Sequence, residues 1–434
     1  MNYRSASGLQ NCAREFLAWP FGDRRTQLNY PCYPSAFFNQ YGHAAKTPFG
    51  REYGRTGINM VAQQNEGGIL LHAGSDLGIA AECQRFVDFA ANLGIESFLQ
   101  TTIEIDERRV IFRLREELLN NLVPGHDTLQ LCERFQLDPL ASEADLEREI
   151  LLAMLSSPVI FEYPGYTEFA ASVRIRRNIV KASRVTALAF HTSKIERPGH
   201  YWKYSEDCGF TLRSGKPLIE ALRMATQPGL SGEKYSFSCY RATEYVILLG
   251  IAQELAESNP ALLQELQSQW ESRAIMSRQF HDIFTREYGS MGEPLPEKYF
   301  VPGDRLWFRN PDERSAEIIG YEGSWVIYLG GGLFTNFWKY ENPYTLASKC
   351  IEIYHWRSGV FQDAEGQWQM NEAIVEEKVR DTLRDPVSAE HILESMMRLR
   401  DPQGVFGDGG CLDASREYPR WVCPGSSDLI LPGQ

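Results

Sequence analysis

The spacing of apolar residues changes once within the stretch from 234 to 255. Tyr235, Ser236 and Phe237 alternate in the manner of a strand. From Thr243 onward the apolar residues recur every three or four positions, as in a helix with one buried face: Val246, Ile247, Leu249, Gly250 and Leu255. The pattern therefore predicts a strand followed by a helix, with Cys239 at the junction between them.

The same reasoning predicts a mixture of helices and strands elsewhere in the chain. The segment 98–119 alternates and then becomes helical, which indicates a strand before a helix. Ser142 and Asp145 have the spacing of a helix cap ahead of an apolar-periodic run, so we expect a helix there. After residue 358 two helices are predicted on either side of Pro386, and the tail from 401 is predicted to be extended.

A shift in composition near residue 155 suggests how the chain is divided. Aromatic residues and strand-like segments become dense between 155 and 358, and the chain turns helical afterwards. We therefore expect an accessory region at 1–154, a core at 155–358 and a helical extension at 359–434. Two roles for the extensions are open: recognition of protein substrates, or a cover over Cys239, for which the aromatic segment 19–41 could serve as a plug.

Charge and cysteine usage narrow the class of protein. The formal net charge of −13 argues against nucleic acid or an anionic membrane as a partner. The nine cysteines form no CxxC pair, which fits reduced thiols better than a disulfide framework or a zinc site. No acidic loop of EF-hand type, signal peptide or eighteen-residue apolar run occurs, so we expect a cytoplasmic protein with no metal or other cofactor.

Cys239 has two possible interpretations. The first turn of a helix carries unpaired N–H groups and the positive end of the helix dipole, which lower the pKa of a thiol and can hold an oxyanion. Cysteine is also one of the residue types most often buried for packing alone. From this window alone, nucleophile and packing residue both remain open.

Five stretches, taken in order, resemble the bacterial protein-glutamine gamma-glutamyltransferases, the transglutaminases associated with spore coats. They are RIRRNIVKAS, HYWKYSEDCGFTL, YSFSCYRATEYVIL, PGDRLWFRNP and YEGSWVIYLGGG. The resemblance covers roughly half of the chain and implies an α+β fold with a papain-like (NlpC/P60-related) core. In such a core a cysteine at a helix N-terminus faces an antiparallel sheet.

The resemblance also implies a reaction and its participants. Cys239 would attack a glutamine carboxamide and release ammonia, and a lysine or other primary amine would then take the acyl group from the thioester. The partners would be proteins that carry glutamine and lysine, and the location could be spore-associated. The resemblance makes Glu322 the closest match to the family's catalytic glutamate, displaced by two residues, and a short insertion or bulge before its strand would explain the displacement.

The histidine expected by the resemblance is missing from this chain. Its place falls near Thr335, Asn336 and Phe337, where Asn336 is the only side chain able to orient a group or hydrogen-bond the thiol. His355 is the nearest downstream histidine and could substitute only if the chain folds back, so we expect it to lie at the surface or to be satisfied in the core. Ser238 replaces a glutamate before the cysteine, and we expect Glu244 to be structural or solvated. Transfer to an amine, hydrolysis by an amidase, and an inactive structural role all remain open.

Overall fold

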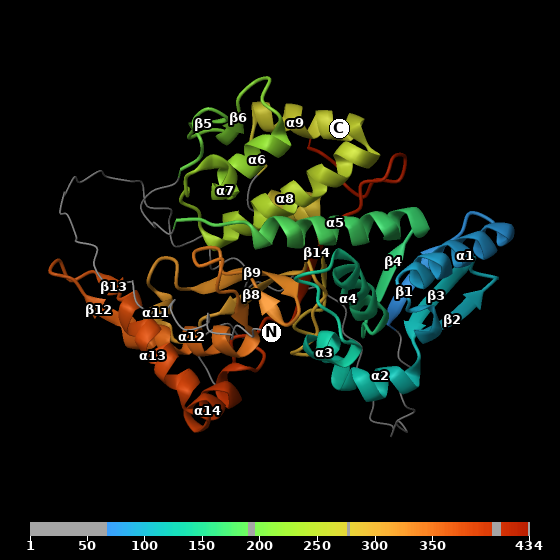
Figure 1. Ribbon diagram of the computed structural model, residues 1–434. Coiled ribbons are helices and arrows are strands. Elements are labelled where there is room, and N and C mark those ends of the chain that lie inside the picture. The colour runs from blue at the N-terminus through green and yellow to red at the C-terminus, as the bar shows by residue number, and fades with distance from the viewer. Residues whose placement is uncertain (1–66, 190–195, 276–277, 402–408, 433–434) are drawn as a thin grey trace, which may run out of the picture. The chain divides into compact units, whose positions relative to one another are not determined.

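The computed structural model describes residues 67–189, 196–275, 278–401 and 409–432. Residues 19–41, considered above as a plug, lie outside these ranges. Within them the chain forms helices and several sheets, so the expected α+β class is confirmed (Figure 1).

A four-stranded sheet occupies the first part of the described chain, with strand order β2-β3-β1-β4. β1 runs antiparallel to β3 and parallel to β4. Its strands are β1 (Gly68–His72), β2 (Leu99–Glu104), β3 (Arg109–Leu114) and β4 (Ile160–Tyr163). Helices and 3-10 turns accompany it: α1 (Asp76–Asn92), η3 (Glu96–Phe98), α2 (Glu116–Leu122), η4 (Pro124–His126), η5 (Thr128–Gln130), α3 (Leu131–Phe135) and α4 (Glu143–Leu155). This sheet combines strands from both sides of residue 155.

The second sheet has six strands, and every pairing in it is antiparallel. Its strands are, in spatial order, β11 (Tyr344–Thr345), β10 (Leu333–Phe334), β9 (Gly323–Gly330), β8 (Arg305–Arg309), β14 (Arg416–Pro419) and β7 (Thr285–Tyr288). The predicted tail thus supplies β14, which lies between β8 and β7.

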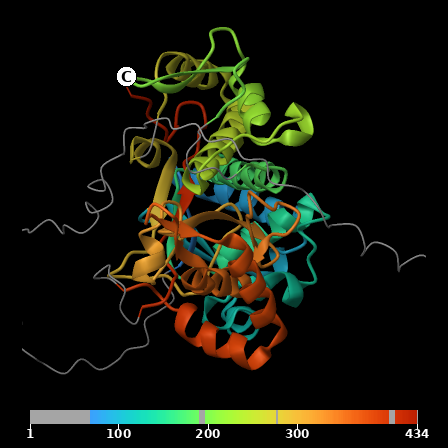
Figure 2. The ribbon, with the colours of Figure 1, turned by 90° about the vertical axis from the view of Figure 1, so that its left-hand side faces the viewer.

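Helices cover both faces of the six-stranded sheet. On one face lie α5 (Tyr166–Arg184) and α8 (Cys239–Ser258), and on the other lies α12 (Leu346–Gly359) (Figure 1). Neighbouring residues of β9 show the division, because Ile327 packs with the α8 residues whereas Val326 packs with those of α12. Figure 2 shows the predicted helices on either side of Pro386, α13 (Glu372–Arg384) and α14 (Pro386–Met396), on the side away from α8.

Smaller elements surround these helices. Two hairpins are formed by β5 (Trp202–Ser205) with β6 (Gly209–Leu212), and by β12 (Val360–Gln362) with β13 (Trp368–Met370). The remaining helices are α6 (Leu218–Thr226), α7 (Pro228–Ser231), α9 (Pro260–Ser272), α10 (Arg278–Phe284) and α11 (Glu313–Ala316). Along the described ranges, every helix is too short or too polar to cross a lipid bilayer.

Helix α8 begins where the sequence predicts, but its burial differs from the prediction. Every residue from Ala242 to Ala252 is buried, so the helix has no exposed face along these three turns. The cause is that α5, α6, α9, α10 and β9 all contact it. The prediction of one buried face is therefore wrong, because the polar residues Thr243 and Glu244 are buried as well.

Gly250 allows α5 and α8 to approach closely. A Cβ at this position would lie 2.5 Å from the Ile179 Cγ1 atom and 2.9 Å from the Ile179 backbone nitrogen. Gly250→Ala is expected to destabilise the protein by about 1–3 kcal/mol, because the overpacking exceeds the gain of about 1 kcal/mol in helix propensity. Urea unfolding measures the change. Gly229→Ala, at a helical glycine with open space around it, is the control, and equal stability of the two variants would contradict this account.

Candidate active site

Cys239 is the first residue of α8, as predicted, but the strand predicted before it is wrong, because among the described residues only an isolated bridge between Ala189 and Ser236 forms there. The segment before it is held by main-chain pairing with Ala189, whose N–H donates to the Tyr235 carbonyl at 3.0 Å. Ser238 caps the helix, since its hydroxyl accepts from the Arg241 N–H at 3.3 Å. The residue that replaces the expected glutamate therefore orients the first turn of α8.

Burial raises the pKa of the Cys239 thiol above its ordinary value. Main-chain hydrogen bonds with Trp325 and Tyr240 and the charge of Lys349 oppose this effect, whereas Glu322 adds to it. The expectation of a lowered pKa is wrong, because desolvation outweighs the helix end. At neutral pH the resting sulfur is consequently a thiol, and its reaction requires a group that removes the proton.

This shift predicts how alkylation of Cys239 depends on pH. The rate with iodoacetamide is expected to reach half of its maximum at a higher pH than for N-acetylcysteine measured alongside, because only the thiolate reacts. Peptide mass spectrometry isolates the Cys239 adduct, and Cys239→Ala supplies the background. A midpoint below that of the free thiol would contradict the burial argument.

Glu322 lies immediately before β9 and within electrostatic range of Cys239. Asn310 holds this end of the strand, because its N–H donates to the Glu322 carbonyl at 3.1 Å and its side chain donates to the Tyr321 carbonyl at 2.8 Å. The Glu322 carboxylate accepts from the Gly320 N–H at 3.0 Å. Burial nevertheless raises the pKa of this carboxyl. The structure thus places a carboxyl and a thiol within electrostatic range of each other, and burial raises the pKa of both.

The bulge expected before the strand is absent from the pairing of β8 with β9. That pairing runs without interruption from Gly323 to Ile327. The irregularity lies instead at Leu333 and Phe334, after the glycine turn. Gly330, Gly331 and Gly332 all have positive φ angles and form the turn between β9 and β10.

Asn336 uses both polar groups of its side chain in a turn. Its N–H donates to the Asn342 carbonyl at 3.1 Å, and its oxygen accepts from the Lys339 N–H at 3.1 Å. The structure therefore gives Asn336 a role in shaping the segment after β10. A catalytic role for Asn336 stays a prediction.

The other residues considered above are occupied by local contacts. His355 is buried, and its Nε2 atom lies 2.7 Å from the Thr382 hydroxyl, as expected for a core histidine. Glu244 is also buried and accepts from Arg241 at 2.5 Å. It is therefore structural and not solvated.

A histidine that no sequence motif indicates lies beside the first turn of α8. His281 of α10 contacts the Tyr240 hydroxyl, and its other ring nitrogen lies 2.9 Å from the Glu417 carboxylate. These residues come from three distant segments with no motif that links them. Only a prediction of the sheet topology, with β14 inserted beside β8, could have shown that these three residues lie together.

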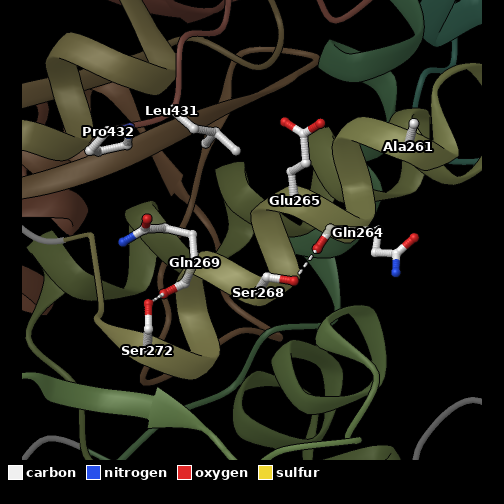
Figure 3. A pocket seen from close by; sticks show the side chains of 8 residues that line it. All are labelled: Ala261, Gln264, Glu265, Ser268, Gln269, Ser272, Leu431 and Pro432. Carbon is white, nitrogen blue, oxygen red and sulfur yellow. Dashed lines mark hydrogen bonds between the residues drawn. The ribbon is translucent and has the colours of Figure 1, made fainter. Parts of the chain in front are cut away.

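The structure also has a shallow groove along α9, distant in sequence from the Cys239 segment (Figure 3). One face of α9 and the C-terminal segment line it: Ala261, Gln264, Glu265, Ser268, Gln269, Ser272, Leu431 and Pro432. The lining contains neither cysteine nor histidine, so it offers no nucleophile. Within the described ranges, no three side chains of His, Cys, Asp or Glu gather to hold a metal ion.

The family model for protein-glutamine gamma-glutamyltransferase matches residues 130–429. The chain belongs to this family. The match includes Cys239 and Glu322, and it also includes β14 and the whole of α4, so it extends beyond both ends of the 155–358 core expected from the motifs.

Two relatives and one solved structure are similar to this chain. The protein-glutamine gamma-glutamyltransferase of Halalkalibacterium halodurans is 26% identical over 225 residues, which cover 48% of this chain and 70% of the relative. The enzyme of the same name from Bacillus subtilis is 25% identical over 187 residues, which cover 42% and 69%. The transglutaminase from Geobacillus stearothermophilus (without C-terminal extension) is 20% identical, with a TM-score of 0.35 over 49% of this chain and 98% of that chain.

Proposed function

We propose that this protein-glutamine gamma-glutamyltransferase family member is a thiol acyltransferase that cross-links proteins. The Cys239 sulfur attacks the carboxamide carbon of a glutamine side chain, the C–N bond breaks, and ammonia leaves. A primary amine, such as that of a lysine, then attacks the thioester carbon and displaces the sulfur. One observation carries the proposal: Cys239 begins a helix, with main-chain N–H groups at its sulfur and the Glu322 carboxyl within electrostatic range.

Glu322 is the acid of the first half of this reaction. It takes the proton of the Cys239 thiol as the S–C bond forms and passes that proton to the departing nitrogen. A carboxyl whose pKa is raised by burial suits both steps, because it can hold the proton near neutral pH and also release it. The main-chain N–H groups near the sulfur supply donors for the oxyanion that develops on the amide oxygen.

The test is incorporation of a fluorescent primary amine into dimethylated casein, with ammonia release followed in parallel. Labelling is expected from the full chain and is expected to be lost in Cys239→Ala. Cys208→Ala is the control, since Cys208 is partly exposed but lies outside the site. Release of ammonia without labelling would show that the protein is an amidase and does not transfer the acyl group to an amine. Absence of both signals from the full chain would favour the structural role.

We propose in addition that the protein acts in the cytoplasm and associates with spores. The resemblance to the spore-coat transglutaminases supports the spore association, and Cys350 and Cys411, whose sulfur atoms lie 3.4 Å apart with no disulfide between them, suit a reducing compartment. Cell fractionation with an antibody to the chain tests the proposal, and recovery only from the culture medium would contradict it.

A further inference from the structure

Three side chains form a continuous hydrogen-bonded chain that begins next to Cys239. The Tyr240 hydroxyl lies 2.7 Å from His281 Nε2, and His281 Nδ1 lies 2.9 Å from Glu417 Oε2. The Thr285 hydroxyl also donates to Glu417 at 3.3 Å, which fixes the carboxylate. The order carboxylate, imidazole and hydroxyl is the order in which an acid–base pair activates an oxygen in acyl-transfer sites.

Arg305 determines which ring nitrogen of His281 carries the proton. Its guanidinium can only donate, and its Nη1 atom lies 3.2 Å from His281 Nε2. Nε2 must therefore present a lone pair, and the proton is on Nδ1, where Glu417 accepts it. The Tyr240 hydroxyl, at 2.7 Å, is the nearer of the two donors to this lone pair, and Arg305 Nη1 also lies 3.3 Å from Glu417 Oε2, so Arg305 keeps an acceptor when Nε2 takes a proton.

The groups that face His281 come from every element packed around it. Tyr240 and the buried carboxyl of Glu244 belong to α8, Arg305 to β8, Glu417 to β14 and the ring of Trp325 to β9. Burial alone would raise the pKa of Glu417, but Arg305 and His281 outweigh burial and hold it below its usual value. Glu417 therefore remains a carboxylate that can stabilise a second proton on His281.

Tyr240 connects this chain to the reacting sulfur. It follows Cys239 directly, it is partly exposed, and its ring packs edge-on against Trp325 with 5.5 Å between ring centres. The Trp325 main chain in turn hydrogen-bonds the Cys239 sulfur. The Tyr240 ring and the Cys239 sulfur thus both contact Trp325, so the two side chains meet at the same residue of β9.

We propose that Tyr240, His281 and Glu417 form a proton relay that serves the amine in the second half of the transfer reaction. The inference rests on the proposed function. It assigns to His281 the proton transfer that the resemblance expects from a histidine near Asn336, where this chain has none. As the amine nitrogen bonds to the thioester carbon, its proton moves to the Tyr240 oxygen while the Tyr240 proton moves to His281 Nε2. As the C–S bond breaks, the proton returns along the same path to the Cys239 sulfur. The imidazolium between the two steps is paired with Glu417.

The relay predicts a defect confined to one half of the reaction. In Tyr240→Phe, the single turnover that releases one equivalent of ammonia per Cys239 is expected to keep its rate within about twofold. Amine incorporation is expected to fall by about 10²-fold or more, the usual effect of losing a positioned acid or base. The acyl-enzyme should therefore accumulate and be seen as a mass increase on Cys239 in the intact protein.

Two further variants and one control make the test decisive. His281→Gln and Glu417→Gln are expected to give the same imbalance between the two halves. Tyr235→Phe, which removes a hydroxyl that binds Glu233 only five residues earlier, is expected to leave both halves unchanged. Equal slowing of both halves in Tyr240→Phe and His281→Gln would mean a merely structural role and would overturn the relay, as would unchanged amine transfer. Failure of the proposed function looks different, because the unmodified chain would then release no ammonia that depends on Cys239.

Discussion

Replacing Glu322 by Gln is expected to slow the release of ammonia in a single turnover by about 10²–10⁴-fold. The amide keeps the size of the side chain but can neither take the thiol proton nor return it to the departing nitrogen. Rapid-quench measurement of ammonia isolates this step from amine transfer. Glu317→Gln, an exposed position in the same loop, is the control, and an unchanged rate in Glu322→Gln would remove Glu322 from the mechanism.

The pH dependence of the same step follows from the two raised pKa values. Burial raises the pKa of both Glu322 and Cys239, so this coupled pair must carry one proton to react. At low pH both groups are protonated and no base is present, and at high pH both are ionised and no acid is present. A bell-shaped profile is expected, displaced toward alkaline pH relative to the ordinary carboxyl pKa of about 4.3. Glu322→Gln should lose the acidic limb of this profile.

Replacing Arg176 by Met is expected to destabilise the protein by about 3–5 kcal/mol, because it leaves a buried charge without its partner. Arg176 of α5 donates to Asp304 at 2.7 Å, and neither side chain is exposed to solvent. Asp304 also accepts from the Val301 N–H at 2.8 Å and from the Tyr288 hydroxyl, so its carboxylate cannot move away. Urea unfolding measures the loss.

Arg177→Met is the matched control for this measurement. Arg177 is the next residue of the same helix and pairs with Glu147 at 2.7 Å, but both partners are partly exposed. Exposed ion pairs contribute about 0–1 kcal/mol. A loss of similar size in the two variants would show that the Arg176–Asp304 contact does not fix α5 to the start of β8.

The sequence predicted the local features of this site and missed those that depend on distant contacts. Cys239 could be placed at a helix start because the change of period is visible within twenty residues. The contact of Arg176 with Asp304 joins two of the five recognised stretches, but no spacing rule reveals a pairing over such a distance. The resemblance included both stretches but did not predict the contact between these two residues.

The missed parts share one physical cause. Glu417 lies in a short strand of a segment rich in glycine and proline, and its pairing with β7 and β8 decides its position. His281 lies in a seven-residue helix with no motif around it. The burial that raises the pKa of Cys239 is also a property of the packed structure, and the helix-end argument contains no information about it.

The position of β14 between β8 and β7 has a consequence for biosynthesis. The ribosome completes β8 roughly a hundred residues before it reaches β14, which at about 5–20 residues per second is on the order of 5–20 s. During that interval a nascent chain has Cys239, but its six-stranded sheet lacks β14 and the carboxylate of Glu417 is not yet made. A cross-linking enzyme built in this order stays incompetent while it is tethered beside other newly made proteins, and it matures only when the final strand arrives.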